Sequence, residues 1–267
     1  MARDFLRAKL RLLSAKFISL SFREKLADLM ALDESYSEFF TRASYNADGL
    51  LTFHDINCLT RADFVSAYSA GERTGSWKGG DVRWRASICC WAARHCLSLP
   101  GDYVECGVNR GGMALTVIEY AQLFNANKDF FLYDTFDGIH SSLLTDDEKD
   151  FGVQPDRYEE CYAAVCNTFR KYPNVKIVRG EVPTTLHQRS PDKVAFLSID
   201  MNCVVPEIEA LQFFWDKVVP GGIIILDDYG WKSHHLQKKA FDQFCLSHQL
   251  PILQLPTGQG LLIKPSS

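Results

Sequence analysis

The 267-residue sequence lacks several features that would assign it to common functional classes. Its nine cysteines include no C-x-x-C pair, and Cys89 and Cys90 are adjacent, so the spacing fits neither a zinc site nor a disulfide framework. We interpret them as reduced thiols of a cytoplasmic protein. Basic residues number 29 against 33 acidic ones, which argues against nucleic acid as a partner. No apolar run has the length of a bilayer span, so stable membrane insertion is not expected.

Residues 1–100 are predicted to form a helical N-terminal extension without a strong strand. Its first 26 residues carry seven Lys and Arg side chains among apolar ones, and these charges exclude a secretory signal. We interpret this segment as a helix that packs on the protein body or on a second subunit, which would give a homo-oligomer. A helix on a membrane surface and a transit peptide are the alternatives.

The rest of the extension contains two predicted helices and a glycine-rich loop. Thr60 and Asp63 indicate the start of a helix that continues through Tyr68 and ends near Gly71. The apolar stripe of residues 82–99 predicts a second helix. Between them, GERTGSWKGGD holds four glycines, which favours either a lid over a site or an ordinary connector.

From Gly101 the pattern changes to alternating strands and helices, which is typical of a parallel sheet covered on both faces. We place strands at 103–108, 130–134, 175–179, 194–200 and 223–227, and helices at 113–125, 157–171, 206–218 and 234–247. Two apolar runs around P-T-G-Q-G predict a closing hairpin. Residues 101–267 are therefore predicted to form one α/β domain. Its sheet is Rossmann-like, seven-stranded and mostly parallel, with an antiparallel C-terminal hairpin.

The stretch DYVECGVNRGG, residues 102–112, combines a strand, a glycine turn and the start of a helix. This arrangement presents backbone amides to a nucleotide-like ligand, although the turn can also be purely structural. The spacing is not G-x-G-x-x-G, which disfavours an NAD enzyme. It resembles the first motif of class I S-adenosylmethionine (SAM) methyltransferases. The candidate cofactor-binding residues here are Glu105, Gly107, Asn109, Arg110 and Gly111.

Further acidic residues follow the next two predicted strands. Asp134 ends FFLYD, and a carboxylate there can accept both ribose hydroxyls of a nucleoside. Gly180 and Glu181 follow the third strand, where the adenine end is expected. For Glu181, a surface acid or a helix cap is an equal alternative.

Three carboxylates close the last two parallel strands. Asp200 ends VAFLSID, while Asp227 and Asp228 end GGIIILDD. If the strands are neighbours, the three like charges repel one another unless a cation lies between them. Mg²⁺ suits such oxygen ligands, so a metal site is predicted. The alternative is that one acid caps the next helix and another is solvated.

These motifs also resemble one family. ECGVNRGG, LYDTFDG, FLSID, PGGIIILDDYG and AFDQF are similar to the macrocin O-methyltransferase (TylF/MycF) group of class I SAM-dependent enzymes. The resemblance covers about residues 100–265 and implies Mg²⁺-dependent methylation of sugar hydroxyls on natural products. It implies a metal site at Asp200, Asp227 and Asp228. Likewise it implies SAM contacts from Glu105, Gly107 and Asp134, with Phe136 and Asp137 lining the approach.

The chain departs from the family at the expected base. The family reads D-G-D after the fourth strand, whereas this chain has Asp200-Met201-Asn202, and an amide is not a useful proton acceptor. His234 and His235 are candidate replacements because imidazole titrates near neutrality. A pair of exposed histidines at a helix start is an equal alternative. In a third case, the metal alone acidifies the hydroxyl.

The sequence therefore predicts a SAM-dependent, Mg²⁺-assisted O-methyltransferase for a hydroxyl of a small molecule. Residues 139–156 and the loop 71–81 are expected to fold over the site. Two alternatives remain. One is a metal-dependent hydrolase that uses the acidic cluster, and the other is a catalytically silent subunit that keeps the SAM-binding fold.

Overall fold

The computed structural model describes residues 42–153 and 158–266. Of these, residues 47–50 and 56–266 form the main unit, whereas 42–46 and 51–55 belong to another. Strands β1 (Tyr45–Ala47) and β2 (Leu50–Thr52) pair as a small two-stranded sheet, so the extension that was expected to hold no strong strand contains two short ones. The predicted basic helix of the first 26 residues lies outside the described residues.

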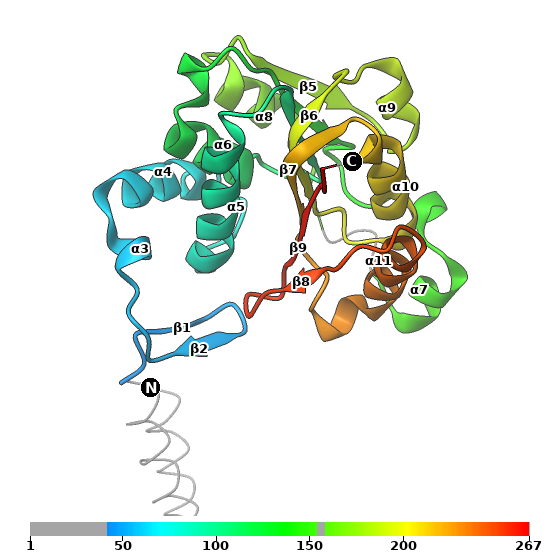
Figure 1. Ribbon diagram of the computed structural model, residues 1–267, viewed down its shortest axis with the longest axis horizontal. Coiled ribbons are helices and arrows are strands. Elements are labelled where there is room, and N and C mark those ends of the chain that lie inside the picture. The colour runs from blue at the N-terminus through cyan, green and yellow to red at the C-terminus, as the bar shows by residue number, and fades with distance from the viewer. Residues whose placement is uncertain (1–41, 154–157, 267) are drawn as a thin grey trace, which may run out of the picture. The chain divides into compact units, whose positions relative to one another are not determined.

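A seven-stranded sheet forms the centre of the main unit (Figure 1). Its order is β5-β4-β3-β6-β7-β9-β8, in which β3 to β7 are mutually parallel, β9 runs antiparallel to β7, and β8 runs antiparallel to β9. This confirms the predicted α/β fold with its C-terminal hairpin. The strands are β3 (Asp102–Cys106), β4 (Phe130–Asp134), β5 (Val175–Arg179), β6 (Val194–Ile199), β7 (Val218–Leu226), β8 (Leu253–Gln254) and β9 (Gly260–Ile263).

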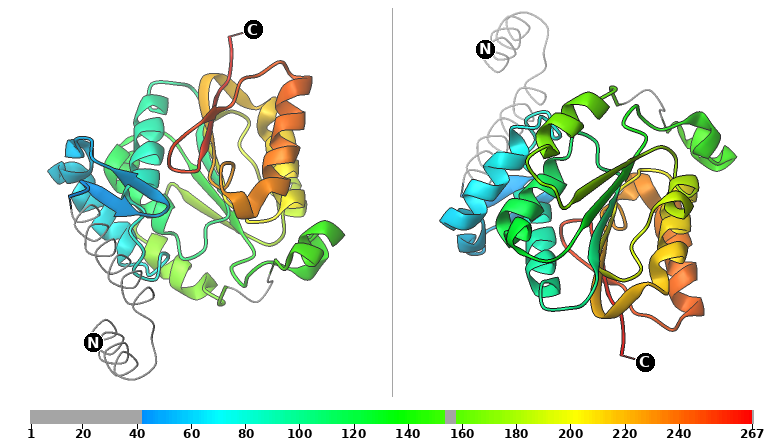
Figure 2. Two further views of the ribbon diagram at one scale, coloured as in Figure 1. Left: turned by 90° about the horizontal axis from the view of Figure 1, so that it is seen from below. Right: turned by 90° about the horizontal axis from the view of Figure 1, so that it is seen from above.

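Helices cover both faces of this sheet, and Figure 2 shows the two layers. One hydrophobic cluster joins the sheet to α5, α6 and α8, and a second joins it to α9, α10 and α11. The helices are α3 (Asn57–Thr60), α4 (Ala62–Glu72), α5 (Arg83–Cys96), α6 (Gly112–Ala121), α7 (Asp146–Phe151), α8 (Tyr162–Phe169), α9 (Thr184–Gln188), α10 (Val204–Trp215) and α11 (His235–Ser247). No helix in the described part of the chain is long and apolar enough to span a bilayer.

The central strands β6 and β7 are enclosed on both faces, which explains their continuous apolar sequences. Every residue of β6 is buried, as are the last five residues of β7. A parallel strand covered by helices on both sides exposes no polar face, so the first strongly polar residues come where it ends. Because β6 and β7 are parallel neighbours, the acids that follow them lie at the same edge of the sheet.

Several helix boundaries differ from the expected ones, and two of the differences have a clear structural reason. The helix predicted to reach Val218 ends at Trp215, because Val218 already begins β7. The predicted cap Thr60 instead ends α3, and Arg61 precedes α4 without a side-chain cap. Gly71 lies inside α4, where a β-carbon would approach Thr116 Oγ1 to 2.1 Å. Its role is therefore close helix packing.

Candidate active site

The glycine turn after β3 has a backbone that few residues other than glycine adopt. Gly107, Asn109 and Gly111 have φ values of +90°, +50° and +83°. A β-carbon on Gly107 would lie 1.7 Å from the carbonyl oxygen of Asp200. The turn thus packs directly against the end of β6, and α6 starts immediately after it. Glycine is required here both by conformation and by contact.

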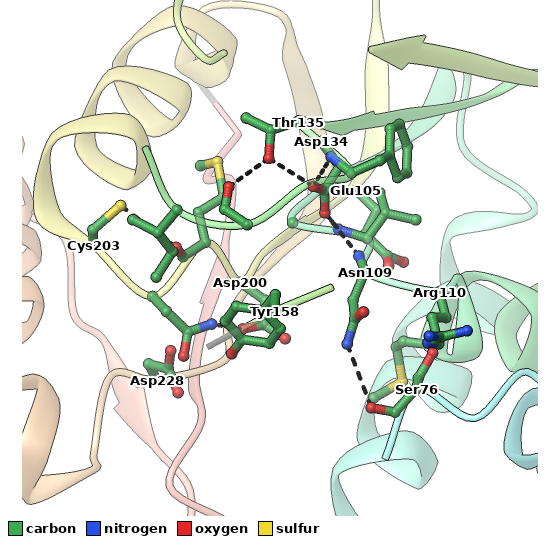
Figure 3. A pocket seen from close by; sticks show the side chains of 18 of the residues that line it. Ser76, Glu105, Asn109, Arg110, Asp134, Thr135, Tyr158, Asp200, Cys203 and Asp228 are labelled. Carbon is green, nitrogen blue, oxygen red and sulfur yellow. Dashed lines mark hydrogen bonds between the residues drawn. The ribbon is translucent and has the colours of Figure 1, made fainter. Parts of the chain in front are cut away.

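Asp134, at the end of β4, fixes the shape of this turn. Its carboxylate accepts hydrogen bonds from the backbone amides of Val108 at 2.6 Å, Asn109 at 2.7 Å and Phe136 at 2.7 Å, and from the hydroxyl of Thr135 at 3.4 Å (Figure 3). Burial raises the pKa of this carboxyl, while the amide bonds partly offset the rise. Asp134 therefore links β4 to the glycine turn, and a carboxylate oxygen can accept more than one hydrogen bond.

Glu105, on β3, is a buried acid with an unused oxygen. Its side chain is 2% exposed, and Oε2 has no hydrogen-bond partner among the described residues. Burial raises its pKa well above the usual range, and the charges of Asp227 and Asp134 act in the same direction. Buried polar atoms are almost always paired, so an unpaired acceptor that lines a cavity indicates a missing donor.

The three acids after β6 and β7 meet as predicted from strand order. Asp200, Asp227 and Asp228 each offer an oxygen, and these atoms lie within 4.8 Å of one another. Burial raises the pKa of Asp200 well above its usual value, and the neighbouring charges of Asp227 and Asp228 raise it further. Such a cluster is stabilised by positive charge.

Part of that charge comes from a residue that was not predicted from the sequence. Arg85, on α5, donates from Nη1 to Asp227 and from Nε and Nη2 to Asp48, at 2.6 and 3.0 Å. Burial lowers the pKa of Arg85, but the nearby charges of Asp227 and Asp48 raise it by more. The other oxygen of Asp227 accepts from Gln259 Nε2 at 2.9 Å.

Asn202, which stands where the resemblance predicts an acid, lies beside Asp200. Its backbone is left-handed, with φ +59°, and its Nδ2 donates to Asp200 Oδ1 at 3.0 Å. The amides of Met201 and Asn202 both donate to the buried carboxylate of Glu207, at 3.1 and 2.8 Å. Asn202 therefore orients Asp200 through a neutral side chain.

The two candidate histidines occupy different places. His234 lines the cavity, with Nε2 3.5 Å from Asp228 Oδ2. His235 is exposed, packs edge-on against Phe151 at 4.9 Å between ring centroids, and does not line the cavity. The structure thus brings only His234 to the acidic cluster.

The remaining candidate residues also divide into those that line the cavity and those that do not. Phe136, Gly180 and Arg110 line the cavity, and Arg110 forms an ion pair with Glu159 at 3.0 Å. Asp137 and Glu181 do not line it. They instead hold His140 from both sides, Glu181 at Nδ1 (2.5 Å) and Asp137 at Nε2 (2.9 Å).

This histidine cluster should make stability depend on pH. The hydrogen bonds to Glu181 and Asp137 raise the pKa of His140 above its usual value. Its stabilising effect is therefore complete below about pH 6.5 and is lost as pH rises through the raised folded value. We expect His140→Gln to flatten the decline in unfolding free energy between about pH 6 and pH 9 in urea titrations. The exposed His187→Gln is the control, and equal profiles for wild type and His140→Gln would contradict the assignment.

One cavity of about 630 Å³ is lined by Glu105, Gly107, Asp134, Asp200 and Asp228. It extends from the glycine turn, where Figure 3 shows Asn109, Arg110 and Ser76, to the acidic cluster with Asp200 and Asp228. The Ser76 hydroxyl accepts a hydrogen bond from the amide of Gly112 at 2.8 Å, which joins the loop 71–81 to the start of α6. That loop contributes Gly75, Ser76, Trp77, Lys78 and Gly80 to the cavity wall, and the segment 139–156 contributes Ile139 and Leu143.

A further contact anchors helix α7. The sequence contains the pattern for it, but we did not predict the contact. Thr145 and Glu148 form a capping box at α7, the T-x-x-E pattern of a helix start. Glu148 is also buried, and its Oε1 accepts from the amide of Val204 at 2.7 Å, at the first turn of α10. This bond ties α7 to the helix that follows the Asp200 loop.

Comparison with known proteins agrees with this geometry. The profile of the macrocin-O-methyltransferase (TylF) family matches residues 83–253, which is more than half of the chain. The chain belongs to this family. The match includes the glycine turn, Asp134, the acidic cluster and Arg85, whereas Asp48 and Gln259 lie outside it.

Individual relatives of this TylF-family chain are distant. Mycinamicin III 3''-O-methyltransferase of Micromonospora griseorubida is 24% identical over 153 residues, which is 51% of this chain and 60% of that protein. Among solved structures, the O-methyltransferase NovP aligns at 20% identity over 68% of this chain and 80% of its own, with a TM-score of 0.60. The calicheamicin methyltransferase CalS11 aligns at 17% identity over 67% and 78%, with a TM-score of 0.55. These structures share the fold.

Proposed function

We propose that the chain is a SAM-dependent, Mg²⁺-assisted O-methyltransferase that acts on a hydroxyl of a small molecule. One observation carries the proposal: a single cavity joins the glycine turn to the acidic cluster. A nucleoside-containing cofactor and a hydroxylated acceptor therefore have adjoining places. The family, and the names of the mycinamicin and calicheamicin enzymes, favour a sugar or another natural-product scaffold as the acceptor.

The residues at the turn fit SAM. Glu105 presents an unpaired buried carboxyl oxygen, which suits the ammonium group of the cofactor. Gly107 keeps side-chain atoms out of the turn, and Asp134 stands where a nucleoside ribose is held in such folds. Bound SAM would supply an electrophilic methyl group on sulfur.

The acidic cluster fits a divalent cation. Three carboxylate oxygens within 4.8 Å of one another form the donor set that Mg²⁺ prefers, and the charge of Arg85 alone does not balance them. Asp200, Asp227 and Asp228 would hold the ion. A bound cation would favour ionisation of an acceptor hydroxyl beside it.

The protein itself orients the reactants and accepts the proton. The loop 71–81 and the segment 139–156 both contribute to the cavity wall, which limits the access of water. With an amide at Asn202, His234 is the candidate proton acceptor of the site, because its ring lies beside Asp228 and lines the cavity.

This assignment separates the two neighbouring histidines. We expect His234→Asn to lower kcat by about 100-fold, the usual contribution of a general base. His235→Asn should change it less than about twofold, because His235 is exposed and outside the cavity. Initial rates with saturating SAM measure both. Equal effects of the two substitutions would exclude His234 as the base.

The activity is tested directly with methyl-labelled SAM and a panel of hydroxylated acceptors that includes nucleotide sugars, glycosides and catechols. We expect transfer of label to an acceptor with release of S-adenosylhomocysteine, dependent on Mg²⁺ and abolished by a chelator. Hydrolysis of phosphate esters without SAM would favour the hydrolase alternative. SAM binding without transfer to any acceptor would favour a silent subunit.

A further inference from the structure

An arginine on a helix, not on the strands that carry the acids, forms an ion pair with the acidic cluster. Arg85 projects from α5, and its side chain is only 18% exposed. Its guanidinium group bonds Asp227 on one side and Asp48, at the tip of the β1–β2 hairpin, on the other. Arg85 and Asp48 both line the cavity, so neither belongs to a distant surface ion pair.

Of the three acids in the cluster, Asp227 is the one that Arg85 bonds directly. Arg85 bonds Oδ2 of Asp227, and Gln259 bonds Oδ1 at 2.9 Å, so each carboxylate oxygen already has one donor. Asp227 is 4% exposed, which means that these bonds are weakly screened by water. Arg85 therefore holds a fixed positive charge against the cluster.

The charges in this region give Arg85 two opposite effects. When no metal is bound, its charge offsets the repulsion among three close carboxylates and keeps the fold stable. When a divalent cation enters, the same charge repels it and competes for Asp227. Asp48 bonds the far side of the guanidinium group at 2.6 and 3.0 Å, so it neutralises part of that charge and weakens the competition.

We infer that Arg85 is the resident counter-cation of the Asp200, Asp227 and Asp228 cluster, and that Asp48 sets how strongly it competes with a divalent metal. The inference rests on the metal site of the proposed function. Arg85 is a positioning residue that acts through Asp227. It takes no direct part in methyl transfer. Its effect is on metal affinity, which can be measured without SAM or an acceptor.

The inference predicts opposite effects of two substitutions. Arg85→Gln removes the competing charge, so the dissociation constant for Mn²⁺ should fall about tenfold or more. Asp48→Asn leaves Asp227 as the only partner among the described residues that forms an ion pair with Arg85, so that constant should rise by about tenfold. Titration of the full chain with Mn²⁺, followed by electron paramagnetic resonance of the free ion, measures both. A purely structural role would weaken binding in both variants and would overturn the inference.

The control is Arg83→Gln, two residues earlier on the same helix. Arg83 pairs with Asp81 at 2.7 Å, and it does not line the cavity. We expect its Mn²⁺ affinity to equal that of the wild type. If Arg83→Gln shifts the affinity as much as Arg85→Gln does, general surface charge explains the effect and the inference fails.

Thermal unfolding with and without Mn²⁺ gives a second measurement that does not depend on one variant. Metal should raise the Tm of Asp48→Asn less than it raises that of the wild type, and should raise the Tm of Arg85→Gln more. If Arg85→Gln is unfolded without metal, Asp48→Asn alone decides: an increase in Tm at least as large as that of the wild type overturns the inference.

The wild-type titration separates this inference from the proposed function. If the wild type binds no Mn²⁺ but Arg85→Gln binds it, the arginine has replaced the metal; the inference holds and the use of Mg²⁺ by the native enzyme does not. If neither protein binds Mn²⁺, both are rejected. If the wild type binds Mn²⁺ and Arg85→Gln binds it no more tightly, only the inference is rejected.

Discussion

Replacement of Asp228 by alanine is expected to lower methyl transfer by about 100-fold or more while it leaves SAM affinity within about threefold of the wild type. The substitution removes one of three oxygen donors of the cluster, and Asp228 follows β7 whereas the glycine turn follows β3. Asp228 is a better choice than Asp227, whose removal would leave the buried charge of Arg85 partly unpaired.

Two measurements check this prediction. Initial rates report the methyl transfer, and calorimetric titration reports SAM binding by the same preparation. Asp192→Ala, an exposed acid ahead of the amino end of β6, is the matched control and should alter neither. A loss of SAM affinity as large as the loss of rate would show that Asp228 serves cofactor binding and would remove the support for a metal role.

The second large effect is expected at the glycine turn. A β-carbon on Gly107 would meet the Asp200 carbonyl oxygen at 1.7 Å, and backbone cannot move aside as a flexible side chain does. Gly107→Ala should therefore lower the free energy of unfolding by roughly 3 kcal/mol or more and abolish SAM binding. Urea titration and calorimetry measure the two effects.

Gly152→Ala provides a control with the same backbone strain and no clash. Gly152 has φ +89°, similar to the +90° of Gly107, but a β-carbon there meets no atom of the described residues within 4 Å. We expect a cost of about 1 kcal/mol from the left-handed conformation and unchanged SAM binding. If the two variants lose equal stability, the contact between the turn and β6 is not what requires Gly107.

The fold and the cluster of acids could be predicted because the sequence repeats one simple pattern. The strands β3 to β7 are short, β6 and the end of β7 are almost wholly apolar, and neighbouring parallel strands end at the same edge of the sheet. The acids that follow β6 and β7 therefore had to meet once those strands were adjacent. Hydrophobic pattern and chain direction are sufficient to predict this meeting.

The partners of those acids could not be predicted in that way. Arg85 and Asp227 are 142 residues apart, and Arg85 and Asp48 are 37 apart. Their meeting depends on how α5 and the hairpin tip pack, and an arginine inside a helix with other charges carries no signal of it. For the same reason the sequence did not distinguish His234 from His235, since one step along the chain decides which ring faces the cavity.

Calorimetric titration of the full chain with SAM, with and without Mg²⁺ and with NAD as the comparison ligand, tests directly whether the chain is a methyltransferase. The account predicts a dissociation constant for SAM on the order of micromolar, with no heat from NAD. Absence of SAM binding in both conditions would contradict the methyltransferase assignment. The cavity and the acidic cluster at its wall would then have to serve another chemistry.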